Sequence, residues 1–495
     1  MVKLLVKDIE VSGSPLDKIL NPRSIAFLGG SNSIENIGTS QLLNIIKGGY
    51  QGKVYPVHPR EKEIMGLKAY LSVTDLPEPA DVAVMVIPNT AVPEALEQCG
   101  KKGIRGAIII TAGYEEMGPE GRRLQDHLVQ IARKHGIRFL GPNCIGIINS
   151  EIGLNTTWFA HLYKPGHVGI ASQSGSYVTQ TLPYFANLGL GLSKAISVGN
   201  QADIDMVDCL EYLGADPQTR AIALYIEGLK RPRQFMEVAR KITPRKPVVA
   251  IYVGGTDAGR RASLSHTGSI SGPDELYDGL FRQCGILRAW TLTDLFDWAL
   301  ALAQQPLPSN NRIIVLSNSG GPATSTADEC NRQGLEVPPF DIEIQKKIRA
   351  ITPLTASPKN PIDITMNYDL ELIFKKLPEL TLQLDQYDGM LFYGIFGPIH
   401  FEHKIKMADR SIEIPLDFFR NWMLEVCEAF VQIPEKYRKP IICSCFCGRE
   451  DEAVAFLQDH GIPVYPAPER AVRAMAALWR YKQIKDNFKL SGNTR

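Results

Sequence analysis

Short apolar runs that end in glycine, proline or asparagine recur along this chain and alternate with helical patterns. Five such runs follow one another from residue 24, at residues 24–30, 53–59, 81–88, 106–113 and 137–143. Near-continuous apolar runs of this length are typical of parallel strands that are covered on both faces. Before the fifth run, Leu124, Leu128 and Ile131 recur at helical spacing and Gly136 follows, which predicts an amphipathic helix with a glycine stop.

The same alternation restarts twice further along the chain. A chain of 495 residues is too long for one hydrophobic core. The segment 303–311 is rich in Pro, Gln and Asn and is typical of a linker. The sequence therefore predicts an α/β protein with parallel sheets, divided into domains at 1–150, 151–303 and 304–495.

The charge balance excludes several classes of partner. The chain has 54 Lys and Arg against 53 Asp and Glu, a net charge of +1, so we expect neither nucleic acid nor an anionic membrane as a partner. No segment has the roughly 20 apolar residues that span a bilayer, and the first residues have too short an apolar stretch for a signal peptide. Nine scattered cysteines, an odd number without a disulfide pattern, indicate a reduced, cytoplasmic protein.

Three cysteines alternate near the C-terminal end. Strand geometry would place Cys443, Cys445 and Cys447 on one face, where a metal site can be imagined. Zinc motifs need a second ligand pair, which this chain lacks. We therefore expect a buried strand and no metal site.

A glycine-rich turn follows the first apolar run. The stretch "LGGSNSIENIG", residues 28–38, suits a phosphate-bearing ligand at a helix N-terminus. Its spacing does not match the dinucleotide fingerprint, and Pro59 and Arg60 occupy the place where an NAD site needs an acid. Arg60 favours a ligand with an extra phosphate, such as NADP or coenzyme A.

Two later runs end in a common element. "ASQSGS" at 171–176 and "LSNSGGP" at 316–322 both read Ser-x-Ser-Gly and precede a predicted helix. Bare backbone N–H groups at a helix start attract phosphate. We interpret the pair as a weak internal repeat of an anion-binding turn.

Together these motifs resemble a known superfamily. "SIAFLGGS", "VYPVHP", "GPNCIGIIN", "KPGHVGIASQSGS", "DPQTRAIALYIEG" and "SHTGS" occur in the order found in NDP-forming acyl-CoA synthetases, the superfamily of succinyl-CoA synthetase and ADP-forming acetyl-CoA synthetase. The chain is similar to the α subunit of the acetyl-CoA type over nearly its whole length. The resemblance implies a Rossmann-like CoA-binding domain followed by two flavodoxin-like domains.

The resemblance also implies roles for individual residues. His266, in the "SHTG" loop, matches the histidine that is phosphorylated, and Glu227 matches the glutamate that orients it. A neutral imidazole is a suitable nucleophile near pH 7, and a carboxylate partner fixes its tautomer. The phosphate cradle maps to Ser174, Gly175 and Ser176, with Ser319, Gly320 and Gly321 in the third block. The CoA contacts map to Gly30, Ser31, Asn32, Ser33, Arg60, Pro88, Asn89, Thr111, Ala112, Gly113, Asn143 and Cys144.

The implied reaction converts a carboxylate, CoA and ATP reversibly to acyl-CoA, ADP and phosphate, through an acyl phosphate and a phosphohistidine. The chain has neither a Walker loop nor an ATP-grasp pattern, so ATP, ADP and Mg²⁺ are expected on an ATP-grasp β subunit, in an α2β2 assembly. The sequence does not specify the acid.

Two alternatives stay open: a CoA-binding scaffold protein without catalysis, and an acyl or carbamoyl transferase that uses phosphate. The presence of His266 and Glu227 argues against a scaffold, which needs neither. The aromatic segment 392–426 fits either a pocket for a bulky acid or a cover for the third sheet or a subunit contact.

Overall fold

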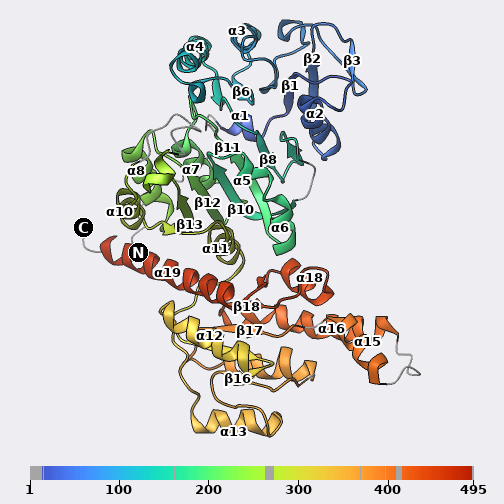
Figure 1. Cartoon of the computed structure of the whole chain (residues 1–495), viewed down its shortest axis with the longest axis vertical. Coiled ribbons are helices and arrows are strands. Elements are labelled where there is room, and N and C mark those ends of the chain that lie inside the picture. Colours follow the sequence, from blue (N-terminus) through green and yellow to red (C-terminus); the bar gives the residue numbers. More distant parts are fainter. Residues whose placement is uncertain are drawn as a thin grey trace, which may run out of the picture. The chain divides into compact units, whose positions relative to one another are not determined.

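The computed structural model describes residues 14, 16–159, 163–261, 272–367, 369–395, 397–408 and 415–492. The chain divides into two compact units. The first unit comprises Met1–Pro183 and Gly191–Trp290, and the second comprises Tyr184–Leu190 and Thr291–Arg495. Each unit is built from parallel sheets with flanking helices (Figure 1).

The first sheet is formed by five parallel strands in the order β2-β1-β5-β6-β7. Their bounds are β1 Ser24–Leu28, β2 Lys53–Val57, β5 Val82–Met85, β6 Gly106–Ile109 and β7 Arg138–Leu140. The flanking helices are α1 Asp17–Leu20, α2 Ile37–Lys47, α3 Val92–Lys102 and α4 Pro119–His135. A small hairpin follows β2, with β3 Glu63–Ile64 and β4 Leu67–Lys68. Short 3₁₀ turns lie at η1 Val73–Asp75 and η2 Glu115–Met117.

The second sheet also belongs to the first unit and has the order β14-β13-β12-β10-β11-β8-β9. Its parallel strands are β10 Lys164–Ser172, β11 Gly191–Ser197, β12 Ala221–Ile226, β13 Val248–Tyr252 and β14 Leu287–Arg288. At one edge, β8 Ile147–Asn149 and β9 Leu154–Asn155 add an antiparallel extension. The helices of this block are α5 Ser176–Thr179, α7 Met206–Ala215, α8 Pro232–Ile242 and α10 Asp274–Cys284. Helix α6, Leu182–Leu188, groups with the second unit from Tyr184 onward.

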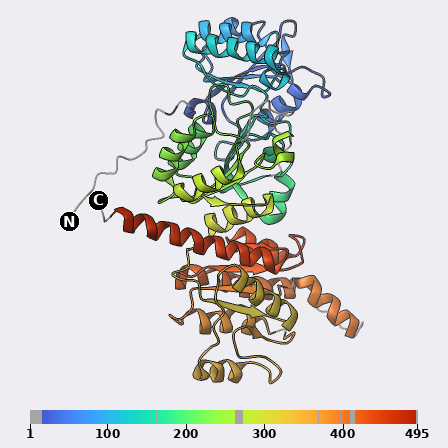
Figure 2. The ribbon, with the colours of Figure 1, turned by 60° about the vertical axis from the view of Figure 1, so that its left-hand side comes forward.

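The third sheet, in the second unit, has the order β16-β15-β17-β18-β19. Its strands are β15 Ile313–Ser317, β16 Ile362–Asp363, β17 Gly389–Tyr393, β18 Ile441–Ser444 and β19 Val464–Tyr465. Its helices are α11 Leu292–Gln304, α12 Gly320–Arg332, α13 Ile342–Ile351, α14 Leu377–Leu382, α15 Pro398–Ala408, α16 Leu416–Val431, α17 Ile433–Tyr437, α18 Glu452–Asp459 and α19 Pro468–Gly492. A π-helical turn, η3 Leu372–Lys376, precedes α14. The long helix α19 is one continuous rod in Figure 2.

All three sheets share one doubly wound order. Counting only the five parallel strands of each block, the second strand lies beside the first, and the third, fourth and fifth follow on the other side. The predicted fold class, a Rossmann-like domain followed by two flavodoxin-like domains, is confirmed. Ligands of such sheets bind at the carboxyl ends of the strands, at the switch point where the order reverses. These switch points lie between β1 and β5, between β10 and β12, and between β15 and β17.

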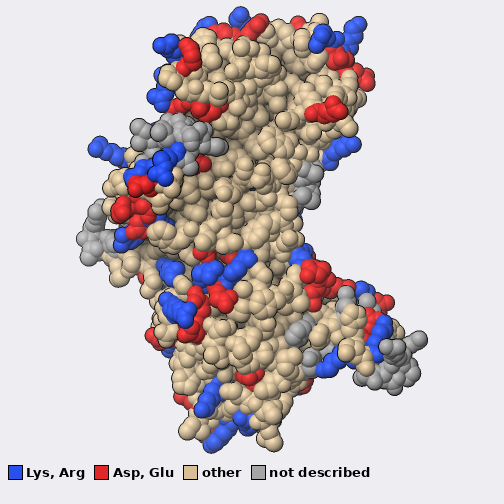
Figure 3. Space-filling model, viewed as in Figure 1, with Lys and Arg blue, Asp and Glu red and all other residues tan. Residues whose placement is uncertain are grey.

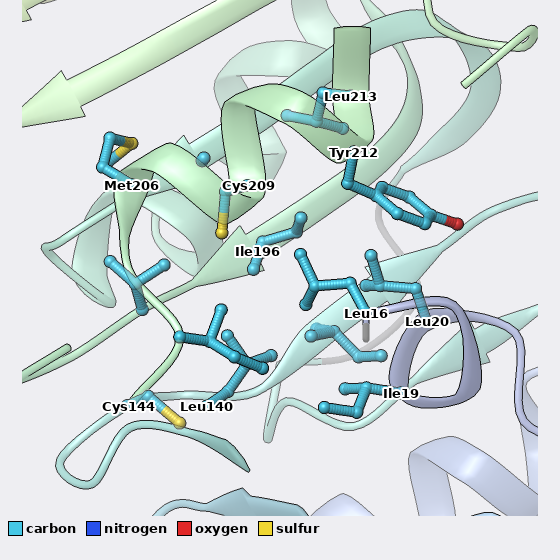
Figure 4. Close-up of a cluster of buried hydrophobic side chains, with 14 of the residues drawn as sticks. Leu16, Ile19, Leu20, Leu140, Cys144, Ile196, Met206, Cys209, Tyr212 and Leu213 are labelled. Atoms are coloured by element: carbon cyan, nitrogen blue, oxygen red, sulfur yellow. The ribbon is translucent and has the colours of Figure 1, made fainter. Parts of the chain in front are cut away.

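One hydrophobic core joins the first two sheets. Figure 4 shows side chains around α1 and β7 packed with side chains of β11 and α7. The labelled members are Leu16, Ile19, Leu20, Leu140, Cys144, Ile196, Met206, Cys209, Tyr212 and Leu213. The predicted boundary at residue 150 therefore separates two sheets that share buried apolar surface. The other predicted boundary, between residues 303 and 304, falls before the last residue of α11, a helix that groups with the second unit. Both boundaries stay predictions.

The aromatic segment 392–426 contributes to the core of the third block. Phe419, Met423 and Val426 of α16 are buried among the side chains that cover the third sheet. This placement agrees with the covering role considered above.

The cysteine triplet differs from its predicted geometry, because β18 ends at Ser444. Only Cys443 lies on the strand, Cys445 is buried just beyond it, and Cys447 is exposed. All nine cysteines lie within the described residues, and each is a free thiol.

The surface carries mixed charge. On the face shown in Figure 3, basic and acidic residues are interspersed over both units. Among the described residues, no helix is long and apolar enough to cross a membrane.

Candidate active site

A cavity lies at the first switch point. It has a volume of about 430 Å³ and is bounded by the loops after β1, β2 and β5 and by the start of α3. Gly29, Gly30 and Ser31 form one wall. A Cβ on Gly29 would collide with the carbonyl oxygen of Val86, and Gly29 has a φ of 106°, which L side chains rarely adopt. The wall is therefore bare backbone that a phosphate-bearing ligand can approach closely.

The end of β2 contributes a histidine that the sequence interpretation missed. His58 and Pro59 line the cavity, whereas Arg60 is exposed and does not. Nδ1 of His58 accepts hydrogen bonds from the backbone N–H groups of Arg60, at 3.2 Å, and Glu61, at 3.0 Å. Two donors on Nδ1 require the tautomer with the proton on Nε2. The Nε2–H of His58 is thus available as a hydrogen-bond donor beside the cavity.

Some predicted CoA contacts hold loops in place. Asn32 does not line the cavity; its side chain donates to the Glu63 carbonyl at 2.9 Å and accepts from the Met65 N–H at 3.0 Å. Asn36, which the prediction omitted, does line the cavity and caps α2 by accepting from the Gly38 N–H at 2.8 Å. Asn32 thereby fixes the small hairpin to the glycine turn.

The loops after β5 and β6 are tied together in a similar way. Pro88 lines the cavity, and the neighbouring Asn89 donates to the Gly113 carbonyl at 3.2 Å. The Thr111 hydroxyl donates to the Ile87 carbonyl at 2.6 Å. Ser33 and Ala112, like Thr111 and Gly113, lie outside the cavity lining.

The second switch point joins the predicted cradle to Glu227. The turn Ser174–Ser176 follows β10, and Glu227 follows β12. The Gln173 carboxamide oxygen accepts the backbone N–H groups of Glu227, at 2.6 Å, and Gly228, at 3.1 Å. Glu227 itself is buried, with 6% of its surface exposed. The structure thus brings the predicted carboxylate and the predicted phosphate-binding turn to one sheet edge.

Asn143 and Cys144 lie beside this edge. A Cβ on Gly175 would lie 3.0 Å from Cβ of Ile145, the residue that follows Cys144. The Cys144 thiol donates to the Ile109 carbonyl at 3.3 Å, and burial raises its pKa to about 12. Cys144 is therefore a neutral thiol that packs in the shared core (Figure 4), and Asn143 is the polar group at this position.

His266 lies outside the described residues. The described flank at Gly272 accepts a hydrogen bond from the hydroxyl of Tyr252, at 2.7 Å. Tyr252 ends β13 and pairs with Ile226, the residue before Glu227. The described residues that follow His266 in sequence thus begin, at Gly272, next to the Glu227 edge.

The third switch point holds Ser319, Gly320 and Gly321 at the start of α12. A Cβ on Gly320 would lie 3.1 Å from a carboxylate oxygen of Asp363, so this turn already has an anionic neighbour. Within the described part of the chain, no group of three His, Cys, Asp or Glu residues is arranged to hold a metal ion.

Comparison with known proteins agrees with this geometry. Residues 23–150 match the model of a CoA binding domain, and residues 165–302 match a succinyl-CoA ligase like flavodoxin domain. The alpha subunit of ADP-forming acetate–CoA ligase II from Pyrococcus furiosus is 38% identical over 467 residues, which cover 94% of this chain and 97% of that protein. The chain belongs to the family of ADP-forming acetyl-CoA synthetase α subunits.

Other relatives show how family members are built. The ADP-forming acetate–CoA ligase of Methanocaldococcus jannaschii is 36% identical, and the match covers 95% of this chain but 64% of that longer protein. A solved structure of the dinucleotide forming acetyl-coenzyme A synthetase 1 of Ca. Korarchaeum cryptofilum, in complex with phosphate and ADP, is 34% identical. It superimposes with a TM-score of 0.84 and covers 96% of this chain and 98% of its own.

Proposed function

We propose that this chain is the α subunit of an ADP-forming acyl-CoA synthetase, in which CoA occupies the cavity between β1 and β5. Two sites in one compact unit support the proposal. A cavity with a wall of glycine backbone lies at the first switch point. Glu227 and a Ser-Gly turn lie at the second switch point. His58 and Ser31 offer hydrogen-bond donors to the phosphates of CoA, and Arg60 adds a positive charge near the end of β2.

The proposed reaction uses His266 as the carrier of the phosphoryl group. Its imidazole nitrogen attacks the γ-phosphorus of ATP, and ADP leaves. A carboxylate oxygen then attacks phosphohistidine, which forms an acyl phosphate and frees the imidazole. Finally, the CoA sulfur attacks the acyl carbon, the C–O bond to phosphate breaks, and the departing phosphate takes up the thiol proton.

Named residues of this chain support the individual steps. Glu227 hydrogen-bonds the second imidazole nitrogen and stabilises the ring when it carries positive charge or phosphate. The backbone N–H groups of Ser174, Gly175 and Ser176 bind the phosphate oxygens. Because the reaction ends on CoA while His266 must also meet ATP, the phosphoryl group is expected to pass between two sites.

We infer that ATP and Mg²⁺ bind on an ATP-grasp partner subunit in an α2β2 assembly in the cytoplasm. The names of the Pyrococcus furiosus relatives, both alpha subunits, support a separate partner subunit.

The decisive test is His266→Ala in the complex with the partner subunit. We expect loss of acetate-dependent phosphate release from ATP and CoA, because no other residue is proposed to carry phosphate. CoA should still stabilise the variant in thermal melts, because the cavity is formed by the first sheet. Full activity in the alanine variant would exclude the phosphohistidine mechanism.

Melts of the purified chain test the ligand assignment. A ligand at about 100 times its Kd adds roughly 2.7 kcal/mol to the free energy of unfolding. We expect stabilisation by CoA and none by ATP. A larger shift with NAD or NADP would contradict the assignment of the cavity to CoA.

A further inference from the structure

A row of hydrogen-bonded side chains crosses from α4 and η2 to the loop after β11 and ends on Asn143. The Glu115 carboxylate accepts from the Gln125 amide at 2.6 Å, and the Gln125 oxygen accepts from the Asn200 amide at 3.0 Å. The Asn200 amide also donates to the Glu116 carboxylate at 2.6 Å. The Asn200 oxygen in turn accepts from the Asn143 amide at 3.3 Å.

The two carboxylates fix the direction of every bond in this row. Burial alone would raise the pKa of Glu116, but hydrogen bonds from Asn200 and from the backbone N–H groups of Gly113 and Tyr114 hold it below its usual value. An ionised carboxylate accepts hydrogen bonds only. The amide nitrogen of Asn200 must therefore face Glu116 and Gln125, which leaves its oxygen facing Asn143.

This polarity determines which atom Asn143 presents. Its amide nitrogen faces Asn200, so its carboxamide oxygen lies on the opposite side. Within the described residues, no side chain or backbone group donates to that oxygen. Cys144, the neighbouring residue, donates its thiol to the Ile109 carbonyl. Asn143 is half-buried, and its oxygen is a free acceptor beside the second sheet edge.

The backbone holds both asparagines in place. The Asn200 N–H donates to the Pro142 carbonyl at 3.0 Å, and the Asn143 N–H donates to the Thr111 carbonyl at 2.9 Å. Asn143 has a φ of 56°, in the left-handed region that asparagine tolerates better than most residues. Gly199 lies so close that a Cβ there would collide with the Pro142 carbonyl. The Lys230 ammonium donates to the Asn200 carbonyl at 2.8 Å.

We propose that Asn200 is a positioning residue that directs the carboxamide oxygen of Asn143 to a hydrogen-bond donor at the reactive end of CoA. The donor is the thiol S–H or the amide N–H of the cysteamine group. The inference rests on the proposed function, because it assumes that CoA binds with its thiol at the edge between the first and second sheets. A carboxamide is not a base, so the oxygen contributes orientation of the thiol for attack and does not remove its proton.

The test compares Asn200→Ala with Asp203→Asn in the complex with the partner subunit. Asp203 lies on the same loop and pairs with Arg138 of the first sheet at 2.8 Å, and it makes no hydrogen bond to Asn143. We expect Asn200→Ala to lower kcat/KM for CoA about 10- to 100-fold and Asp203→Asn to leave it within about twofold. ATP-dependent phosphorylation of His266 should be unchanged in both variants, because that step does not involve the thiol.

Melting curves of every variant test for loss of folding. The isosteric Asn200→Asp variant keeps an oxygen that can accept from the Asn143 amide, so we expect it to retain more kcat/KM for CoA than Asn200→Ala. Its carboxyl group meets the Glu116 carboxylate, so we expect a lower melting temperature than for the unaltered chain. A double-mutant cycle then isolates the coupling. If Asn200 acts through Asn143, the double alanine variant should be no slower than Asn143→Ala alone. Additive losses would overturn the proposal.

Two further outcomes separate this inference from the proposed function. If the unaltered complex neither phosphorylates His266 nor forms acetyl-CoA, the proposed function fails. If it does both and Asn200→Ala matches Asp203→Asn, only the positioning role fails. Desulfo-CoA, which lacks the thiol, identifies the donor. If Asn200→Ala weakens the binding of both CoA and desulfo-CoA, the donor is the amide N–H. If it weakens the binding of CoA alone, the donor is the thiol.

Discussion

The two Ser-x-Ser-Gly turns, one in each compact unit, have nearly the same framework and different surroundings. In the first, the Ser172 hydroxyl donates to the Ser174 carbonyl at 2.7 Å, and in the second, the Ser317 hydroxyl donates to the Ser319 carbonyl at 2.7 Å. The backbone N–H of the middle residue, Gln173 or Asn318, donates in both cases to a tyrosine carbonyl on the neighbouring strand, at 3.2 Å.

The surroundings differ in charge and in helix length. The first turn lies against Ile145 and Glu227 and precedes a helix of four residues, α5. The second precedes a helix of 13 residues, α12, and has Asp363 next to its glycine. A carboxylate at a helix N-terminus is stabilising and competes with a phosphate for the same N–H groups. The two sheets thus share one turn framework, whereas phosphoryl transfer through His266 requires the acid beside the first turn, Glu227.

The largest expected difference between the two turns is the loss of turnover when the neighbouring carboxylate is replaced by an amide. Glu227→Gln keeps the shape but removes the charge that steadies a protonated or phosphorylated imidazole, so we expect turnover to fall on the order of 10²- to 10⁴-fold. Asp363→Asn should change turnover less than tenfold. The measurement is acetate-dependent phosphate release at saturating CoA and ATP. Equal losses in the two variants would mean that the third switch point contributes as much as the second.

A smaller difference is expected in the melting temperature when the glycine of each turn, Gly175 or Gly320, is replaced by alanine. In Gly175→Ala the new methyl group meets the branched Cβ of Ile145 at 3.0 Å, in a packed region, and overpacking of this kind costs about 1–3 kcal/mol. In Gly320→Ala the neighbour is the end of a carboxylate side chain, 3.1 Å away, which can shift. We expect the first variant to lower the melting temperature of the full chain more than the second. A reversed order would show that Ile145 yields more easily than Asp363.

The smallest effect on activity is expected from alkylation of two thiols, Cys144 in the first unit and Cys447 in the second. Burial raises the pKa of Cys144 to about 12, so at pH 8 only about one Cys144 in ten thousand is a thiolate. Cys447 is exposed. Iodoacetamide at pH 8 should label Cys447 and spare Cys144, with activity unchanged; peptide mass spectrometry identifies the site. As the pH rises toward 12, Cys144 should become reactive. Rapid labelling of Cys144 at pH 8 would contradict its burial.

Much of this architecture could be predicted from sequence, because parallel strands that are buried on both faces leave continuous apolar runs. The apolar run 221–226 coincides with β12 and Glu227 follows it directly, so the pattern places the acid at a strand end. The antiparallel strands β8 and β9 were not predicted, since each is three residues or fewer and too short to show a period.

The contacts of the site were harder to predict for a physical reason. Arg60 fitted the chemistry of a phosphate contact, yet the chain turns after Val57 and exposes His58 to the cavity. Asn200 and Glu116 are 84 positions apart, and their hydrogen bond exists only because the loop after β11 lies along residues 139–142. No local pattern marks either residue, so only the assembled structure reveals the row that ends on Asn143.

The shared core of the first two sheets has a consequence for how this protein can be divided. Ile196 and Met206 belong to the same buried cluster as Leu140 and Leu16, so a cut at residue 150 would leave apolar surface uncovered on both fragments. Neither piece is expected to stay dispersed in water alone, although each carries a complete parallel sheet. Gene fusion or fission in such a lineage should therefore spare the join near residue 150, and the two sheets should be inherited together.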